Sequence, residues 1–318
     1  MPLTSHYHLM THQHPPTLHG KALLEAMASR ADWASLRHAN FDAFGLKIFP
    51  LEALHARELV MLSLFDNQLT TVPEEIRQLR MLRTLNLGHN LLEAVPASLG
   101  GLAQLEMLDL GHNRLSEVPP ALGALSRLAF LYLSNNRLRV LPDELAALRQ
   151  LRYLNLTDNQ FEALPEWLGV LARLVELRVY NNTLRALPES LGALSQLVEL
   201  HANKNLLASL PESIGNLRAL NKLILQSNRL TALPEALGEL RSLTELDLRF
   251  NLLAALPMSL SRLHALEYLD LRANELTAVP EGLCELPRLR KLDLRWNRLE
   301  TFPSCLNKLI ERGCLVYV

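Results

Sequence analysis

The chain of 318 residues is 49% hydrophobic, which is enough to bury a large core in one or two domains. Its 32 basic and 33 acidic residues leave a net charge of -1, so there is no electrostatic basis for binding nucleic acid or an anionic membrane. No run of apolar residues approaches the roughly 18 that a membrane-spanning helix needs, and no membrane association is expected.

The first 19 residues carry five histidines among prolines and threonines: His6, His8, His12, His14 and His19. Two pairs have His-x-His spacing and could chelate a metal ion. The polar composition is more typical of a segment that stays unfolded because it has little apolar surface to bury. We therefore expect residues 1–19 to form a disordered His-rich tail.

Residues 20–58 have the features of an N-terminal cap. The segment "KALLEAMASRADWASL" places four apolar residues on one face of a predicted helix: Leu23, Leu24, Met27 and Ala28. Residues 36–58 then follow the spacing of the repeat described next, with Phe44 where that repeat has asparagine. A helix and a degenerate repeat of this kind would cover the open end of a stacked array.

From Leu59 a block of 23 residues recurs without insertion to Glu311, which gives eleven copies over residues 59–311. Two consecutive copies read "LRTLNLGHNLLEAVPASLGGLAQ" and "LEMLDLGHNRLSEVPPALGALSR". Position 15 is proline in every copy, from Pro73 to Pro303. Position 9 is asparagine in every copy: Asn67, Asn90, Asn113, Asn136, Asn159, Asn182, Asn205, Asn228, Asn251, Asn274 and Asn297.

Each position of the repeat has a physical interpretation. Leucines at positions 4 and 6, such as Leu85 and Leu87, lie on one side of a predicted strand, and the residues between them point to the other side. The asparagine can bond backbone groups where the strand turns away, and a column of asparagines would form a ladder. Proline at position 15 suits the first turn of a following helix. Because one copy cannot bury its leucines alone, stacked copies with one continuous core are predicted.

The pattern LxxLxLxxNxLxxLPxxLGxLxx resembles the leucine-rich repeat family in its 23-residue intracellular, Ras-suppressor-like form. The resemblance covers about residues 36–318 and extends to bacterial leucine-rich repeat proteins, including type III secreted effectors. It implies an α/β solenoid, a curved horseshoe with a parallel β-sheet on the concave face. Short helices or 3-10 turns would then form the convex face.

The array ends in a truncated strand at residues 312–318, "RGCLVYV", with Leu315 and Tyr317 at positions 4 and 6. An uncovered strand edge is a ready surface for pairing with another chain. Self-association through this C-terminal edge is therefore one expectation, and a tolerated edge or a natural chain that continues past Val318 are the others.

Three cysteines occur in the chain, Cys284, Cys305 and Cys314, and their odd number and spacing argue against a disulfide framework. The N-terminus also lacks the basic start and apolar run of a cleavable signal peptide. A cytoplasmic location is expected, or secretion into a host cell if the chain is an effector. High alanine, leucine and arginine usage is a weak indication of a bacterial source.

No catalytic constellation is recognisable in the sequence. The cysteines have no histidine close to them in the repeat frame, and no phosphate-binding glycine loop or zinc-type Cys/His spacing occurs. His89 and His112 share position 8 of adjacent copies, where polar residues are common, and a metal site there is not favoured. We expect no enzyme activity, no cofactor and no metal.

Side chains at positions 3, 5, 7 and 8 are free of the core and should face the concave surface or its rim. The last three full copies, "LDLRFN", "LDLRAN" and "LDLRWN", place an aspartate column beside an arginine column. Because neighbouring strands lie about 4.8 Å apart, each aspartate can reach an arginine. An internally satisfied ion-pair network is favoured over an arginine patch for an acidic partner.

The middle copies carry larger side chains at these free positions. Tyrosine and arginine are enriched at binding hot spots, although stacking across strands is the alternative explanation. We expect a partner-binding site composed of Phe130, Tyr132, Tyr153, Arg178, Tyr180, His201 and Asn203.

The favoured function is a non-enzymatic scaffold that binds a partner protein on the concave face. One alternative is the substrate-recognition part of a bacterial effector or a ubiquitin-ligase-type system. A purely structural, consensus-like array is a further alternative, against which the uneven concave columns argue.

Overall fold

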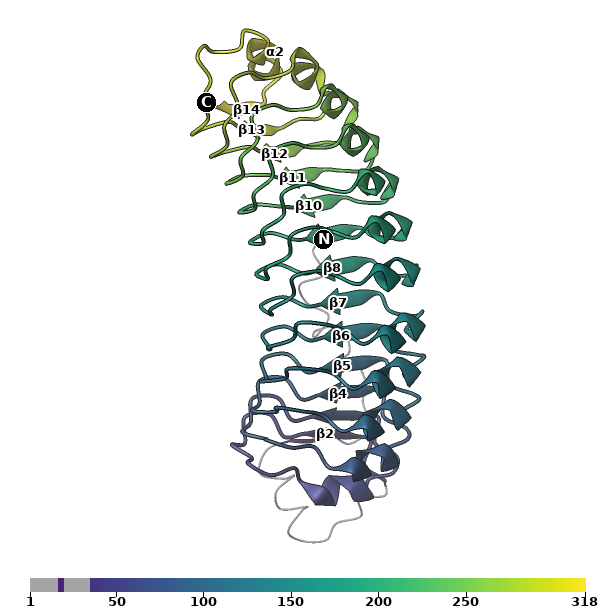
Figure 1. The fold of residues 1–318 in the computed structure, drawn as a ribbon. Helices are drawn as coiled ribbons and strands as arrows, with labels where there is room; N and C mark the ends of the chain where they lie inside the picture. Colours follow the sequence, from purple (N-terminus) through teal and green to yellow (C-terminus); the bar gives the residue numbers. More distant parts are fainter. Residues whose placement is uncertain (1–16, 20–34) are drawn as a thin grey trace.

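The computed structural model describes residues 17–19 and 35–318 as a solenoid with one parallel β-sheet (Figure 1). The sheet has 14 strands of three residues each, in sequence order and all parallel to their neighbours. The strands are β1 Thr17–His19, β2 His38–Asn40, β3 Met61–Ser63, β4 Thr84–Asn86, β5 Met107–Asp109, β6 Phe130–Tyr132, β7 Tyr153–Asn155, β8 Glu176–Arg178, β9 Glu199–His201, β10 Lys222–Ile224, β11 Glu245–Asp247, β12 Tyr268–Asp270, β13 Lys291–Asp293 and β14 Leu315–Tyr317.

Short 3-10 helices line the side of the solenoid opposite the strands (Figure 1). They are η3 Leu51–His55, η4 Glu74–Gln78, η5 Ala97–Gly101, η6 Pro120–Ala124, η7 Asp143–Ala147, η8 Glu166–Val170, η9 Glu189–Ala193, η10 Glu212–Asn216, η11 Glu235–Glu239, η12 Met258–Arg262 and η13 Glu281–Glu285, followed by the α-helix α2 Leu306–Glu311. The predicted horseshoe, with a parallel sheet on one face and 3-10 turns on the other, is confirmed.

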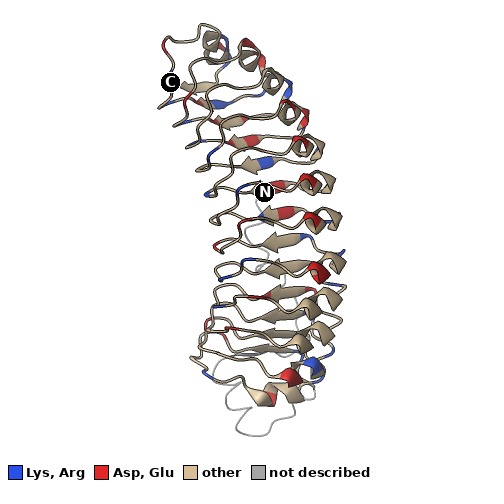
Figure 2. Ribbon diagram, viewed as in Figure 1, with Lys and Arg blue, Asp and Glu red and all other residues tan. Residues whose placement is uncertain are grey.

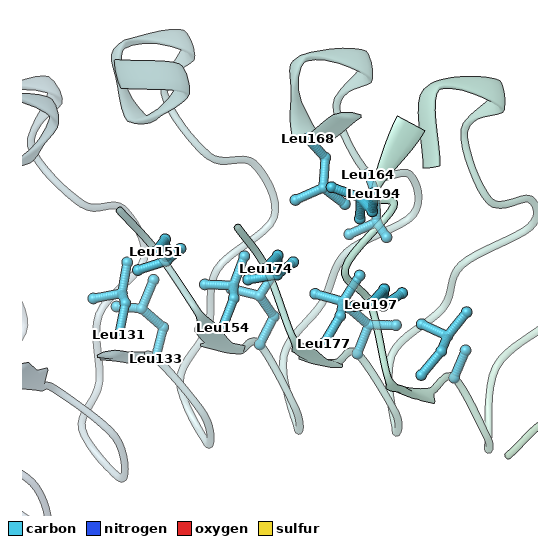
Figure 3. Packing of buried hydrophobic residues seen from close by; sticks show 14 of the residues in the cluster. Leu131, Leu133, Leu151, Leu154, Leu164, Leu168, Leu174, Leu177, Leu194 and Leu197 are labelled. Carbon is cyan, nitrogen blue, oxygen red and sulfur yellow. The ribbon is translucent and has the colours of Figure 1, made fainter. Parts of the chain in front are cut away.

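The leucines of the repeat form one continuous core. Leu131, Leu154 and Leu177 occupy the same place in successive copies and pack side by side (Figure 3). Each is at most 1% exposed. A single copy would leave these side chains in water, so the burial of each leucine depends on its neighbouring copies.

The asparagines form a ladder along the solenoid. The side-chain amide of Asn182 donates to Leu156 O at 3.0 Å and to Val179 O at 3.0 Å. Its Oδ1 accepts the Phe161 N–H at 3.1 Å. Leu156 O also accepts from Asn159, so consecutive asparagines share carbonyl groups. The ladder therefore satisfies buried backbone groups between copies as well as within them.

The prolines at position 15 from Pro73 to Pro280 stand one residue earlier than expected, at the N-cap and not in the first helical turn, whereas Pro303 precedes the N-cap of α2, Cys305. Pro73 has φ -72°, and its carbonyl accepts the N–H of Ile76 at 3.1 Å to start η4. A proline is suited to this place because its ring sets φ and its carbonyl remains free to accept.

The outer helices approach closely because position 19 is glycine in six copies: Gly100, Gly123, Gly169, Gly192, Gly215 and Gly238. A Cβ atom at any of the six would lie 2.2–2.5 Å from a backbone oxygen of the next copy. At a later junction the order is reversed, and Gly282 faces the Cβ of Ser261. One small residue at each of these junctions therefore sets the spacing on the outer face.

Cys284 and Cys305 lie at the next such junction and form a disulfide, with Cα atoms 5.8 Å apart. The sequence argument against a disulfide is therefore wrong for this pair. It overlooked that position 19 of one copy faces position 17 of the next across the stack. Cys314 is free and buried. The cytoplasmic location that rested partly on unpaired cysteines stays a prediction.

The N-terminal end differs from the expected tail. Thr17–His19, placed in the disordered segment by the sequence, form β1 and pair in parallel with β2. The open edge of β2 offers unpaired backbone groups, which explains why a short polar segment becomes a strand. The remaining tail residues and the expected capping helix lie outside the described residues.

The degenerate copy at residues 36–58 is bonded to the first full copy. Phe41 is fully buried, and its carbonyl accepts from Asn67 of the first full copy at 2.8 Å. Asn67 Oδ1 also accepts the Leu46 N–H, so the full copy satisfies the degenerate one.

At the C-terminal end β14 is the last strand of the sheet order. Leu315 is 58% exposed and Val318 is 50% exposed. Self-association through this edge stays a prediction.

Candidate functional site

The predicted partner residues lie on or directly after four neighbouring strands, β6 to β9. We call the set Phe130, Tyr132, Tyr153, Arg178, Tyr180, His201 and Asn203 the central patch. Leucines buried beneath it alternate with its side chains along each strand, as the period of two requires. Six of the seven side chains are half-buried. Asn203 is only 8% exposed, so it offers little surface to a partner.

Two tyrosines stack diagonally across strands. The rings of Tyr132 and Tyr153 have centroids 4.8 Å apart, and the Arg178 guanidinium lies 5.9 Å from the Tyr153 centroid. Burial, with a smaller contribution from the nearby Asp109 carboxylate, raises the pKa of Tyr132 to about 12. Burial also raises the pKa of Tyr153. Both hydroxyls are therefore neutral at physiological pH and available as hydrogen-bonding groups beside an apolar ring.

A buried glutamate lies under the arginine. The Glu176 side chain is 1% exposed, and its Oε1 accepts a hydrogen bond from Arg178 Nε. The other oxygen, Oε2, is buried and has no hydrogen-bond partner among the described residues. A carboxylate in such surroundings is costly unless it is paired, so Glu176 and Arg178 form one unit.

On the next strands a second polar unit continues the row. His201 Nε2 and Glu199 Oε2 are 2.9 Å apart. The hydrogen bond from His201 is the main reason that the pKa of Glu199 is lowered. Lys222 Nζ lies 2.8 Å from Glu245 Oε2, and this bond raises the pKa of Lys222. Each of these carboxylates thus has a polar partner on the same or the next strand.

The strand register explains which predicted residues meet. Phe130 lies opposite Tyr153, and Arg178 lies opposite His201. The prediction missed Glu176 and Glu199, which are neighbours in the same register. The signal was present in the sequence as consecutive glutamates at position 3 beside Arg178 and His201 at position 5. Side-chain burial was not deducible from it.

The last copies contain the predicted ion-pair network. Arg272 bonds Asp270 at 2.6 Å, and its Nε lies 3.5 Å from Asp293 in the next copy. Arg295 bonds Asp293 at 2.7 Å. Figure 2 shows acidic and basic residues interspersed along the ribbon of the solenoid. The arginines are therefore engaged within the sheet, which agrees with the favoured interpretation.

An exposed aromatic pair near this network was missed. Phe250 and Trp296 occupy position 8, which was interpreted as a polar column, and they are 49% and 65% exposed. Their φ angles are +57° and +64°, a region that bulky residues rarely adopt. Their rings are 6.4 Å apart. The signal was two aromatic residues in a column otherwise occupied mostly by Asn, Asp, His and Ser.

A family model described as leucine-rich repeat region matches residues 141–310, more than half of the chain. A second model, leucine rich repeat, matches residues 57–115 and 112–161. The chain belongs to the leucine-rich repeat family. Such repeats generally form non-catalytic scaffolds that bind proteins.

Three solved structures resemble this leucine-rich repeat chain. A leucine-rich repeat protein of Leptospira interrogans is 24% identical, with a TM-score of 0.59 over 96% of this chain and 100% of that one. A second structure is the ectodomain of the Arabidopsis thaliana receptor kinase GASSHO1/SCHENGEN3 in complex with CASPARIAN STRIP INTEGRITY FACTOR 2. It is 29% identical, with a TM-score of 0.70, and the match covers 88% of this chain and 37% of that one. Drosophila Toll, in complex with Spatzle, is 24% identical, with a TM-score of 0.79, and the match covers 88% of this chain and 40% of that one.

The leucine-rich repeat chain thus spans less than half the length of the two receptor chains. A comparison with curated protein sequences gives no match. Within residues 17–19 and 35–318, no helix of the leucine-rich repeat chain is long and apolar enough to cross a membrane.

The ion-pair network predicts a pH effect at Asp247. Burial raises the pKa of its carboxyl from 3.8 to about 6, although Arg249 opposes the shift. The folded chain therefore holds this proton more tightly than the unfolded chain, and the contribution of Asp247 to stability falls as the pH rises from about 4 to 6. The free energy of unfolding of Asp247→Asn, relative to that of wild type, should therefore rise by up to about 3 kcal/mol between pH 4 and pH 7. Thermal unfolding at several pH values measures this gain.

Asp293→Asn is the matched control. Burial alone would raise the pKa of Asp293, but its bonds with Arg295 lower the pKa below 3.8. The stability that Asp293 contributes is therefore present throughout pH 4–7 and is lost only at lower pH. Its variant should be less stable by a constant amount over that range. Parallel pH profiles for the two variants would contradict the assignment.

Proposed function

We propose that this leucine-rich repeat chain is a non-enzymatic scaffold that binds a partner protein on its concave face, at the central patch. The observation that carries the proposal is the clustering of Tyr132, Tyr153, Arg178 and Tyr180 at positions that the repeat does not need for its core. The solenoid would bury its leucines equally well with small polar residues there, as copies with asparagine or threonine at these positions demonstrate.

The chemistry of the central patch supports the proposal. Tyrosine and arginine offer large contact area together with hydrogen-bonding groups, and both are enriched among residues that dominate binding energy. Tyr132, Tyr153 and Arg178 are already held together by stacking and by Glu176, so little side-chain entropy remains to be lost on binding. Stacking that only stabilises the sheet is the competing explanation.

The Arabidopsis ectodomain also supports the proposal, because its leucine-rich repeats are 29% identical to this chain and were solved in complex with CASPARIAN STRIP INTEGRITY FACTOR 2. Its sequence is distant, and its partner is not transferred to this chain. The inference extends only to the use of a repeat scaffold for binding.

The test is a triple variant, Tyr132→Ala, Arg178→Ala and Tyr180→Ala. Removing three hot-spot side chains should weaken binding by more than about 100-fold, since each such residue contributes about 2 kcal/mol or more. A partner is first captured with the wild-type chain from the native cells and identified, and its affinity is then measured with purified proteins.

Tyr268→Ala is the matched control, because Tyr268 is a tyrosine on β12, 45% exposed and outside the central patch. It should leave affinity unchanged, and circular dichroism checks that every variant is folded. Equal affinity of the triple variant and wild type would refute binding at the central patch. It would leave stacking across the sheet as the role of the tyrosines.

A further inference from the structure

Two carboxylates and an imidazole converge on the concave face. Glu176, Glu199 and His201 can each offer one ligand atom, and these atoms lie within 4.8 Å of one another. Glu176 and Glu199 are opposite each other on β8 and β9, and His201 follows on the same face of β9. Among the residues that the structure describes, no other three metal-binding side chains converge in this way.

A second observation points to a ligand at this place. Oε2 of Glu176 is buried and has no hydrogen-bond partner among the described residues, although the carboxylate is paired through Oε1. Burying an ionised oxygen without a partner is costly. The ammonium group of a partner protein could not bond Glu176 Oε2, because this oxygen has almost no accessible surface. A small metal ion inside the cluster does fit it.

The spacing of the other two ligands suits a tetrahedral ion. His201 Nε2 and Glu199 Oε2 are 2.9 Å apart and form a hydrogen bond. Two ligands bonded to zinc at 2.0–2.1 Å stand about 3.3 Å apart, so a modest side-chain movement would admit the ion. When the ion takes Nε2, the neutral imidazole would carry its hydrogen on Nδ1.

The neighbouring cations do not occupy the free oxygen. Arg178 bonds the other oxygen of Glu176, and Lys222 bonds Glu245 at 2.8 Å. Glu176 and Glu199 would supply two carboxylate oxygens beside the positive charge of Arg178, and the imidazole of His201 would complete three protein ligands. Oxygen and imidazole donors of this kind suit zinc.

We propose that Glu176 Oε2, a carboxylate oxygen of Glu199 and His201 Nε2 form a Zn²⁺ site, with the fourth position open to water or to a group from a partner. This contradicts the sequence-based expectation of no metal and goes beyond the proposed function. The site borders the tyrosines of the central patch through Arg178, so a bound ion would become part of the surface that a partner meets.

The experiment titrates Zn²⁺ into the purified chain against a chelating indicator dye. Because the N-terminal histidines could bind zinc themselves, all titrations use a full-length background with His6→Ser, His8→Ser, His12→Ser, His14→Ser and His19→Ser. One Zn²⁺ per chain is expected. Glu176→Gln and Glu199→Gln should each weaken binding at least about tenfold, and so should His201→Ala, because loss of a ligand exceeds the 10–100-fold effect of losing a group that supports one.

Two matched controls lie outside the cluster. Glu245→Gln removes a nearby concave carboxylate, and His112→Ala removes an exposed histidine, and neither should change zinc affinity. Mg²⁺ and Ca²⁺ should compete poorly, since they prefer all-oxygen sites. Absence of stoichiometric binding would overturn the proposal. Equal zinc affinity of the histidine-replaced background chain and of its folded Glu176→Gln and Glu199→Gln variants would overturn it as well. Because no partner is present, failure here would leave the proposed scaffold function intact.

Discussion

Replacing Asn182 with alanine is expected to lower the free energy of unfolding by about 3 kcal/mol. The change leaves the Phe161 N–H buried without an acceptor and removes hydrogen bonds to Leu156 O and Val179 O. Both carbonyls keep one bond, from Asn159 and Asn205, so the loss is smaller than three orphaned groups would give. Denaturant titration measures the total effect, and amide exchange at Phe161 measures the local one.

The adjacent Asn181 provides the control. It is exposed, has φ +55°, and its side chain reaches only Asp158 on the surface. Asn181→Gly keeps a residue that accepts this backbone conformation, so stability should change by less than about 0.5 kcal/mol. If Asn182→Ala and Asn181→Gly lowered the free energy of unfolding by the same amount, the asparagine ladder would not be the main source of order between copies.

Gly100→Ala should destabilise the chain by about 3 kcal/mol, at the upper end of overpacking effects. The new Cβ would lie 2.2 Å from the carbonyl oxygen of Ala121 and 2.8 Å from its carbonyl carbon. Backbone atoms cannot rotate away as a side chain can, so η5 and η6 must separate and the leucines beneath them lose contact. Thermal and denaturant unfolding would show the loss.

Gly101→Ala is a control one residue away. Its Cβ would meet only Arg77 Cβ, at 3.6 Å, an ordinary contact. Alanine also reduces the freedom of the unfolded chain, so this variant should be neutral or gain up to about 1 kcal/mol. Equal losses at the two positions would show that the spacing of the outer helices does not depend on glycine.

The roles of residues that recur in every copy were predictable, because each residue has the same structural role in each copy. Leu177 is buried, Asn182 bonds the backbone and Pro188 caps η9 as the pattern required, except that the proline stands at the N-cap. The parallel strand order follows from stacking identical units. These features depend on local geometry and a constant period, which a single sequence shows directly.

The candidate site was only partly predictable. The residue types in the central patch were identified from the free columns, but their arrangement was not. Tyr132 stacks on Tyr153 across a diagonal, and Glu176 is nearly fully buried beneath Arg178. Both facts depend on rotamers and on the side chains of three neighbouring strands. Aligned repeat positions show which residues share a place in the copies, but they do not show which side chain covers another.

The sequence by itself determined the solenoid, its period, its core and the columns that are free to act. Only the tertiary structure decided how those columns combine: the Cys284–Cys305 pair, the ring pair of Phe250 and Trp296, and the convergence of Glu176, Glu199 and His201. The physical reason is that periodic features are satisfied within one copy and its identical neighbours. The others are contacts between side chains that occur only in particular copies, and these contacts exist only once the copies are stacked.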